Sequence, residues 1–127
     1  MARNKRRRSL QGVGEKMNSE HNEQIRLIAW AKSMDLPLFA IPNGGLRNRL
    51  VAAKMKREGV RAGIPDLFLP CASRGAHGLF IEMKREKGGR TSAAQKEWIA
   101  RLRDAGYAVE VCRGFDEARK AIERYLG

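Results

Sequence analysis

The chain has 127 residues, which is the size of one domain with its own hydrophobic core. Lys and Arg number 26 against 14 Asp and Glu, which gives a formal net charge of +12 and a pI of about 10.5. A balance this basic is typical of proteins that bind a polyanion, most often nucleic acid. No apolar run is long enough to span a membrane, and the basic N-terminus lacks the apolar segment of a signal peptide. We therefore expect neither a membrane-spanning protein nor a secreted one.

Residues 1–18 are predicted to form a flexible basic arm, because they lack hydrophobic periodicity and carry the cationic run Lys5–Arg8. The arm either contacts phosphate groups or is a solvated tail. Residues 19–127 are predicted to form a single domain. The two cysteines of the chain, Cys71 and Cys112, fit no zinc-binding spacing, so we expect reduced thiols in the core of a cytoplasmic protein.

The first half of this domain predicts a helix, a strand and a second helix. The first helix begins after the N-cap residue Ser19 and ends near Asp35, with a buried stripe of Ile25, Ile28, Ala29 and Ala31. A strand over residues 38–41 and a turn over 42–45 follow. The second helix is expected over Leu46–Arg57, with Leu46, Leu50 and Ala53 on one face and Gly59 beyond its end.

The second half predicts a hairpin, a helix, a strand and a last helix. The hairpin strands cover residues 66–69 and 79–84. Ser92 and Gln95 form a capping box for the next helix, which ends at Gly106 and is expected to bury Trp98, Ile99, Leu102 and Ala105. A strand over 107–113 precedes a helix that starts at Asp116 and turns Ala118, Ile122, Tyr125 and Leu126 inward. The order α-β-α-β-β-α-β-α predicts an α/β fold, a mixed β-sheet flanked by helices.

Three charged residues interrupt the hairpin, which otherwise consists of apolar strands. If the strands pair around Gly75, Asp66 lies opposite Lys84 and Phe68 lies opposite Glu82. Asp66, Glu82 and Lys84 then share one face of the sheet, because side chains alternate along a strand. The opposite, core-facing set is Leu67, Leu69, Ile81 and Met83. A slip of one residue in the register would separate the three charges.

Two neighbouring carboxylates beside an ammonium group indicate a particular chemistry. The carboxylates repel one another unless a cation lies between them, and Mg²⁺ prefers oxygen ligands of this kind. The ion activates a phosphate and a water molecule, and a lysine positions the water or stabilises developing negative charge. The pattern therefore indicates metal-dependent phosphodiester hydrolysis. The simpler interpretation is that Glu82 and Lys84 form an ion pair on an exposed strand, but the basic charge balance favours the nuclease.

Six segments in this order resemble a known family. They are SEHNEQ, IPNGG, GVRAGIPDLFLP, GLFIEMK, TSAAQKEW and GYAVEVCRG, within residues 19–126. The combination of GIPD and IEMK resembles the PD-(D/E)XK nuclease superfamily, and the whole set is similar to its VRR-NUC family of small, virus-type nucleases. The resemblance implies a restriction-endonuclease-like core, Mg²⁺ or Mn²⁺ as cofactor and DNA as partner. It also implies a homodimer that resolves branched DNA or four-way (Holliday) junctions in the cytoplasm of a bacterium or of a virus-infected host cell.

The resemblance also implies a role for each matching residue. Asp66 and Glu82 would bind the metal ion together with the backbone carbonyl of Met83, and Lys84 would hold or activate the attacking water. Glu20 would be the additional acid on the first helix, with Glu23 as its competitor. Gln95 is a further candidate, because its position in the capping box also lies near a possible phosphate site.

Six further residues are candidates for DNA contacts: Asn43, Arg47, Arg49, Arg85, Lys87 and Arg90. Asn43 is equally explained by a β-turn, and the two arginines that follow it by a solvated helix face. Two other classes of function stay open. One is a catalytically inactive DNA-binding module, and the other is a basic protein directed at RNA.

Overall fold

The computed structural model describes residues 20–42 and 48–127. The elements, in chain order, are an N-terminal helix over residues 20–33, β1 (Phe39–Ala40), α2 (Arg49–Arg57), β2 (Leu67–Leu69), β3 (Leu79–Lys84), α3 (Ala93–Asp104), β4 (Ala108–Arg113) and α4 (Gly114–Leu126). The predicted order of helices and strands is confirmed. The basic arm, Asn43 and Arg47 lie outside the described residues.

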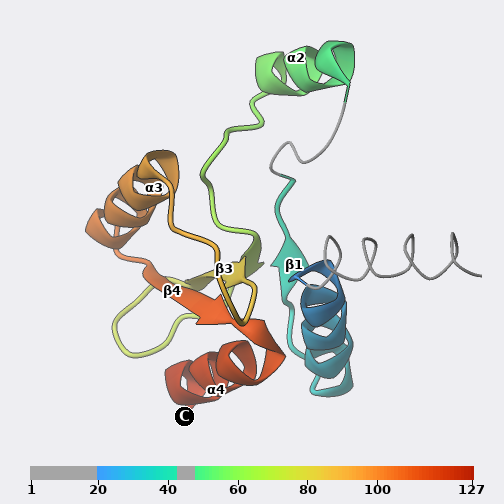
Figure 1. Ribbon diagram of the computed structural model, residues 1–127. Coiled ribbons are helices and arrows are strands. Elements are labelled where there is room, and N and C mark those ends of the chain that lie inside the picture. The colour runs from blue at the N-terminus through green and yellow to red at the C-terminus, as the bar shows by residue number, and fades with distance from the viewer. Residues whose placement is uncertain (1–19, 43–47) are drawn as a thin grey trace, which may run out of the picture.

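The four strands form one mixed sheet in the order β1-β2-β3-β4. β1 and β3 both pair antiparallel with β2, whereas β4 pairs parallel with β3. A parallel pair requires a crossover connection, and α3 supplies it here. Figure 1 shows α3 and α4 on opposite sides of β4. The prediction of an α/β fold with a mixed sheet flanked by helices is therefore confirmed.

The core lies on one face of the sheet. Five strand side chains are fully buried there: Leu67, Leu69, Leu79, Ile81 and Met83. The N-terminal helix covers them with Leu27, and α4 covers them with Ala118, Ala121, Ile122 and Tyr125. This confirms the predicted core face of the hairpin, because side chains alternate along a strand. The opposite face carries Glu82 and also the half-buried, stacked rings of Phe68 and Phe80.

The hairpin register differs from the prediction by two residues. Phe68 pairs with Phe80 rather than with Glu82, and Leu67 pairs with Ile81. The β2 strand also begins at Leu67, one residue later than predicted. Because a shift of two residues keeps every side chain on its face, Asp66 stays on the same side of the sheet as Glu82.

Three of the predicted helix faces were partly wrong. In the N-terminal helix Leu27 and Ala31 are buried, whereas Ile25 is 53% exposed and Ala29 is also exposed. In α3 only Ile99 is buried, and Ala105 is exposed. In α4, Ala121 takes the buried place that was predicted for the exposed Leu126, and the helix starts at Gly114 instead of Asp116. The local apolar pattern admitted several faces, and the position of the sheet selected one.

The second helix is the largest departure. α2 begins at Arg49 rather than Leu46, because Asn48 acts as its N-cap and accepts a hydrogen bond from the Val51 N–H at 2.8 Å. None of its residues is buried, and Leu50, which was predicted to lie on a packed face, is 84% exposed.

Candidate active site

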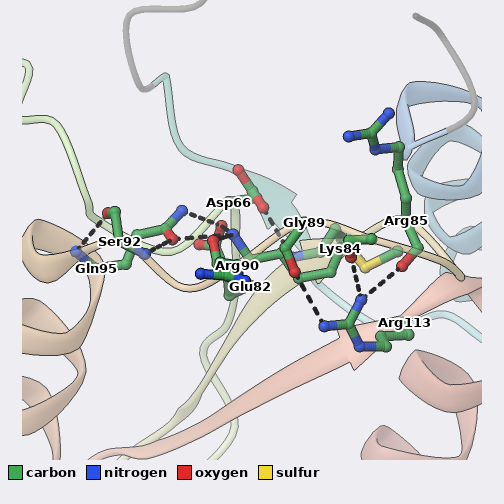
Figure 2. A network of polar contacts seen from close by, with 11 residues as sticks. Asp66, Glu82, Lys84, Arg85, Gly89, Arg90, Ser92, Gln95 and Arg113 are labelled. Atoms are coloured by element: carbon green, nitrogen blue, oxygen red, sulfur yellow. Dashed lines mark hydrogen bonds and ion pairs between the residues drawn. The ribbon is translucent and has the colours of Figure 1, made fainter. Parts of the chain in front are cut away.

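The three charged residues of the hairpin come together at the end of β3 (Figure 2). One carboxylate oxygen of Asp66 accepts a hydrogen bond from the Met83 backbone N–H at 2.8 Å, which fixes Asp66 against β3. Glu82 is 3% exposed and Lys84 is 8% exposed. The Lys84 Nζ lies 3.7 Å from the Glu82 Oε1. The carboxylates and the ammonium group therefore form one largely buried cluster.

Gln95, in the first turn of α3, connects this cluster to the helix (Figure 2). Its Nε2 donates to the Glu82 Oε1 at 2.8 Å, and its Oε1 accepts from the Lys84 Nζ at 2.9 Å. The same Oε1 accepts from the Ser92 backbone N–H, and the Ser92 side chain accepts from the Gln95 N–H, so the predicted capping box is present. One side chain thus caps the helix and orients both charged groups.

The cluster contains more carboxyl groups than cationic groups, and the pKa values of two of its acids are raised. Burial and, after it, the nearby Asp66 raise the pKa of Glu82 to about 8, against the opposing effect of Lys84. The pKa of Glu20 is also raised, first by burial and then by Asp66, while Lys84 and Arg85 act in the opposite direction. Three carboxyl groups therefore share one region with one buried lysine, and the charge of Asp66 disfavours the charged forms of Glu20 and Glu82.

Glu23 has a structural position instead. Its Oε2 accepts a hydrogen bond from the Phe115 N–H at 2.6 Å, in the first turn of α4, and lies 3.7 Å from the Arg26 guanidinium. The first N–H groups of a helix have no partner within the helix, so Glu23 caps α4 from another element. Of the two acids left open by the sequence, Glu20 is the one that interacts with the cluster.

Sequence reasoning missed Arg113 at the end of β4. Its guanidinium donates hydrogen bonds to the backbone carbonyls of Arg85, Gly88 and Gly89 (Figure 2). The next carbonyl of the same loop, that of Arg90, accepts from the Lys84 Nζ at 3.2 Å. Arg113 therefore holds the loop that in turn holds Lys84. No sequence pattern indicates this role, because the acceptors are backbone carbonyls; in the structure Arg113 is the parallel-strand partner of Lys84.

The structure separates the candidate DNA contacts into two groups. Arg85, Lys87 and Arg90 are exposed in the loop between β3 and α3, beside the buried cluster. Arg49 is exposed on α2, which Figure 1 shows apart from the sheet.

Comparisons with known proteins point to one family. The model of the VRR-NUC domain matches residues 4–116. The chain belongs to the VRR-NUC family. A solved structure described as a VRR_NUC domain protein is 33% identical in sequence, covers 84% of this chain and 87% of its own, and superposes with a TM-score of 0.72. No curated protein matches the chain.

Membership of the VRR-NUC family confirms the resemblance found in the sequence and makes the chain a member of a nuclease family. The mixed sheet with its flanking helices is consistent with a restriction-endonuclease-like core. In the part of the chain that the structure describes, no helix is long and apolar enough to cross a membrane.

The oxygen ligands offered by Asp66, Glu82 and Glu20 suit a hard divalent cation. The available groups are carboxylate oxygens, and the Glu82 Oε2 is buried with no hydrogen-bond partner within the described ranges. Over residues 20–42 and 48–127, no three or more His, Cys, Asp or Glu side chains are arranged to enclose a metal ion by themselves. Mg²⁺ does not require such a cage, because it is usually bound by one or two carboxylates and keeps water and phosphate oxygens as its other ligands.

Proposed function

We propose that this VRR-NUC chain is a Mg²⁺- or Mn²⁺-dependent endodeoxyribonuclease. The observation that carries the proposal is the burial and unfavourable charge environment of the Glu82 carboxyl group. Its side chain is buried, one of its oxygens has no partner among the described residues, and its pKa is raised to about 8 by burial and by Asp66. A cation bound between these carboxylates would satisfy the oxygen and remove the repulsion.

Asp66, Glu82 and the Met83 carbonyl would hold the ion, and Glu20 would complete the site directly or through water. When bound, the ion polarises the scissile phosphate and lowers the pKa of a water molecule. Lys84 has three N–H donors, of which two bond to Gln95 and Arg90. Its Nζ also lies 3.7 Å from the Glu82 Oε1, which would be drawn towards the metal ion. We assign the third donor to the attacking water or to a phosphate oxygen, where the ammonium group stabilises developing negative charge.

Gln95 would act as a positioning residue in this scheme. Its amide is fixed by the capping box, so it holds the Glu82 carboxylate and the Lys84 ammonium at the start of α3. A preorganised pair of this kind needs no rearrangement when the substrate binds, which is the main source of electrostatic catalysis.

The proposed substrate is branched DNA, including four-way junctions, and the proposed assembly is a homodimer in the cytoplasm. A twofold dimer carries two active sites, one for each strand that has to be cut. The exposed cations Arg85, Lys87 and Arg90 support phosphate binding next to Lys84. Asn43, Arg47 and Arg49 would extend the contact with the DNA backbone. The proposed domain organisation is a single nuclease domain over residues 19–127, preceded by a basic arm over residues 1–18.

Incubation with four-way junction, flap and linear duplex DNA, and with RNA, tests this function. We expect cutting of DNA in Mg²⁺ or Mn²⁺, none in EDTA, and at least tenfold faster cutting of the junction than of the duplex. Cutting in EDTA would contradict the metal-dependent reaction. Binding of DNA without cutting in either metal would support the inactive module, and faster cutting of RNA would support the RNA-directed alternative.

The two acids of the N-terminal helix provide a matched pair of variants. Glu23→Ala removes the acceptor for the Phe115 N–H, so we expect a loss of about 1–2 kcal/mol in the free energy of unfolding and normal cutting by the folded protein. Glu20→Ala removes a repelled carboxyl group, so we expect unchanged or higher stability and at least tenfold slower cutting. Thermal unfolding and single-turnover cleavage measure both. The reverse pattern would assign the catalytic role to Glu23.

A further inference from the structure

Within the described ranges, α2 has little of the packing that normally stabilises a short helix, and only Ala52 and Met55 are half-buried. It has nine residues, none of them buried, and Figure 1 shows it apart from the sheet and its covering helices. Isolated helices shorter than about 12–15 residues are marginal in water, because most helical stability in proteins comes from tertiary packing. The Asn48 cap and an exposed Lys54–Glu58 pair at 3.9 Å are local contributions that do not replace such packing. By these criteria the described contacts leave α2 marginally stable on its own.

The charge of α2 and of the residues after it identifies the chemistry of a partner that would stabilise the helix. Between residues 49 and 61 there are five cations, Arg49, Lys54, Lys56, Arg57 and Arg61, and one anion, Glu58. Leu50, Lys54 and Arg57 are spaced so that they share one face of the helix. Contact of α2 with its own symmetry copy at the twofold axis of the proposed homodimer would oppose like charges, so α2 is not expected to lie at that axis. A polyanion is complementary to this basic surface.

The position of α2 in the chain places it close to the candidate active site. Eight residues, 58–65, connect the helix to Asp66, so the two are within roughly 30 Å of each other even in extended chain. The connection is held at Gly63, where φ is +91° and a Cβ would lie 2.7 Å from the backbone of Ala94, the neighbour of Gln95. One turn of duplex DNA spans about 34 Å, so DNA at the active site passes within reach of α2.

We propose that α2 is a DNA-binding element whose helix becomes stable when its basic residues contact the phosphate backbone of the bound DNA. The proposal rests on the proposed function, because the DNA is the substrate of the same site. The ordering of α2 would then accompany substrate binding. Residues 58–65 would couple this ordering to the active site, because they connect α2 directly to Asp66.

Hydrogen exchange of the full chain in EDTA tests this directly, with four-way junction and linear duplex DNA as probes. We expect the amides of residues 49–57 to exchange rapidly in the free protein and at least tenfold more slowly with DNA, while α4 is unchanged. Ala53→Gly should weaken binding about fivefold, the effect of glycine on helix formation. Ala100→Gly, at an exposed position of α3, is the matched control and should leave binding unchanged.

The charge contribution is measured by the salt dependence of binding. Lys56→Ala combined with Arg57→Ala should reduce the slope of log affinity against log salt by about 1.8, because each phosphate that is no longer neutralised lowers the slope by about 0.9. Lys120→Ala, an exposed lysine of α4, should not change it. An unchanged slope in the double variant would overturn the proposal.

Three results of the exchange experiment would also overturn it. Strong protection of residues 49–57 without DNA would show a helix stable by itself, and protection that rises with protein concentration would make a second copy the partner. Bound DNA that leaves these amides unprotected would remove α2 from the interface and leave the nuclease intact. Protection by DNA in a chain that cuts nothing would support this proposal and contradict the nuclease.

Discussion

Lys84→Ala should slow DNA cutting roughly 10²–10³-fold, the usual effect of removing one preorganised donor that stabilises developing charge. The lysine is 8% exposed and its Nζ is held by the Gln95 Oε1 and the Arg90 carbonyl. Asp66→Ala should cause a loss at least as large, because it removes a proposed metal ligand. Single-turnover cleavage of a labelled junction in Mg²⁺ measures both effects.

Binding and folding have to be separated from chemistry in this experiment. Both variants should bind the junction in EDTA within a few-fold of the unchanged protein, since the exposed cations Arg85, Lys87 and Arg90 are retained. Lys96→Ala is the matched control, because Lys96 follows Gln95 directly but is exposed. It should cut at nearly the normal rate. Cutting by Lys84→Ala within threefold of normal would rule out the role assigned to this lysine.

Much of the fold was predictable because its signals are local. The strand Leu79–Lys84 was predicted with its bounds, since a run of apolar residues ends in alternating charges there. The capping box of Ser92 and Gln95 predicted the start of α3, because it depends only on residues three positions apart. The cluster of Asp66, Glu82 and Lys84 was predicted from the alternation of side chains along strands. The prediction remained correct although the register was wrong by two residues, because such a shift keeps each side chain on the same face.

The remaining features depend on contacts that leave little trace in the sequence. The long hairpin loop does not fix the register, so the pairing of Phe68 with Phe80 could not be derived. The N-terminal helix has apolar residues at 25 and at 27–31, and only the docked sheet selects Leu27 and Ala31 for burial. Arg113 binds backbone carbonyls, which every residue has, so no pattern of side chains indicates its acceptors. The local amphipathic pattern of α2 gave no sign that none of its residues would be buried by the described part of the chain.

Glu82→Gln should stabilise the metal-free protein at pH 8 and abolish cutting. In the metal-free protein the pKa of Glu82 rises from an ordinary value near 4.5 to about 8, chiefly through burial and then through Asp66. The folded state therefore holds this proton more tightly than the unfolded state. The stability it contributes is complete below about pH 4.5 and is lost as the pH rises towards 8, by up to about 1.4 kcal/mol for each pH unit.

Gln at position 82 is neutral throughout this range, and its carbonyl oxygen can still accept the hydrogen bond from Gln95. Thermal unfolding in EDTA should therefore give the variant a higher melting temperature than the unchanged protein at pH 8. The difference in melting temperature should shrink towards pH 5. Adding Mg²⁺ at pH 8 should raise the melting temperature of the unchanged protein and leave that of Glu82→Gln where it was. A pH-independent gap would contradict the raised pKa. An equal Mg²⁺ shift in both proteins would mean that the ion binds elsewhere, because a site that needs the Glu82 carboxylate cannot respond the same way once the charge is gone.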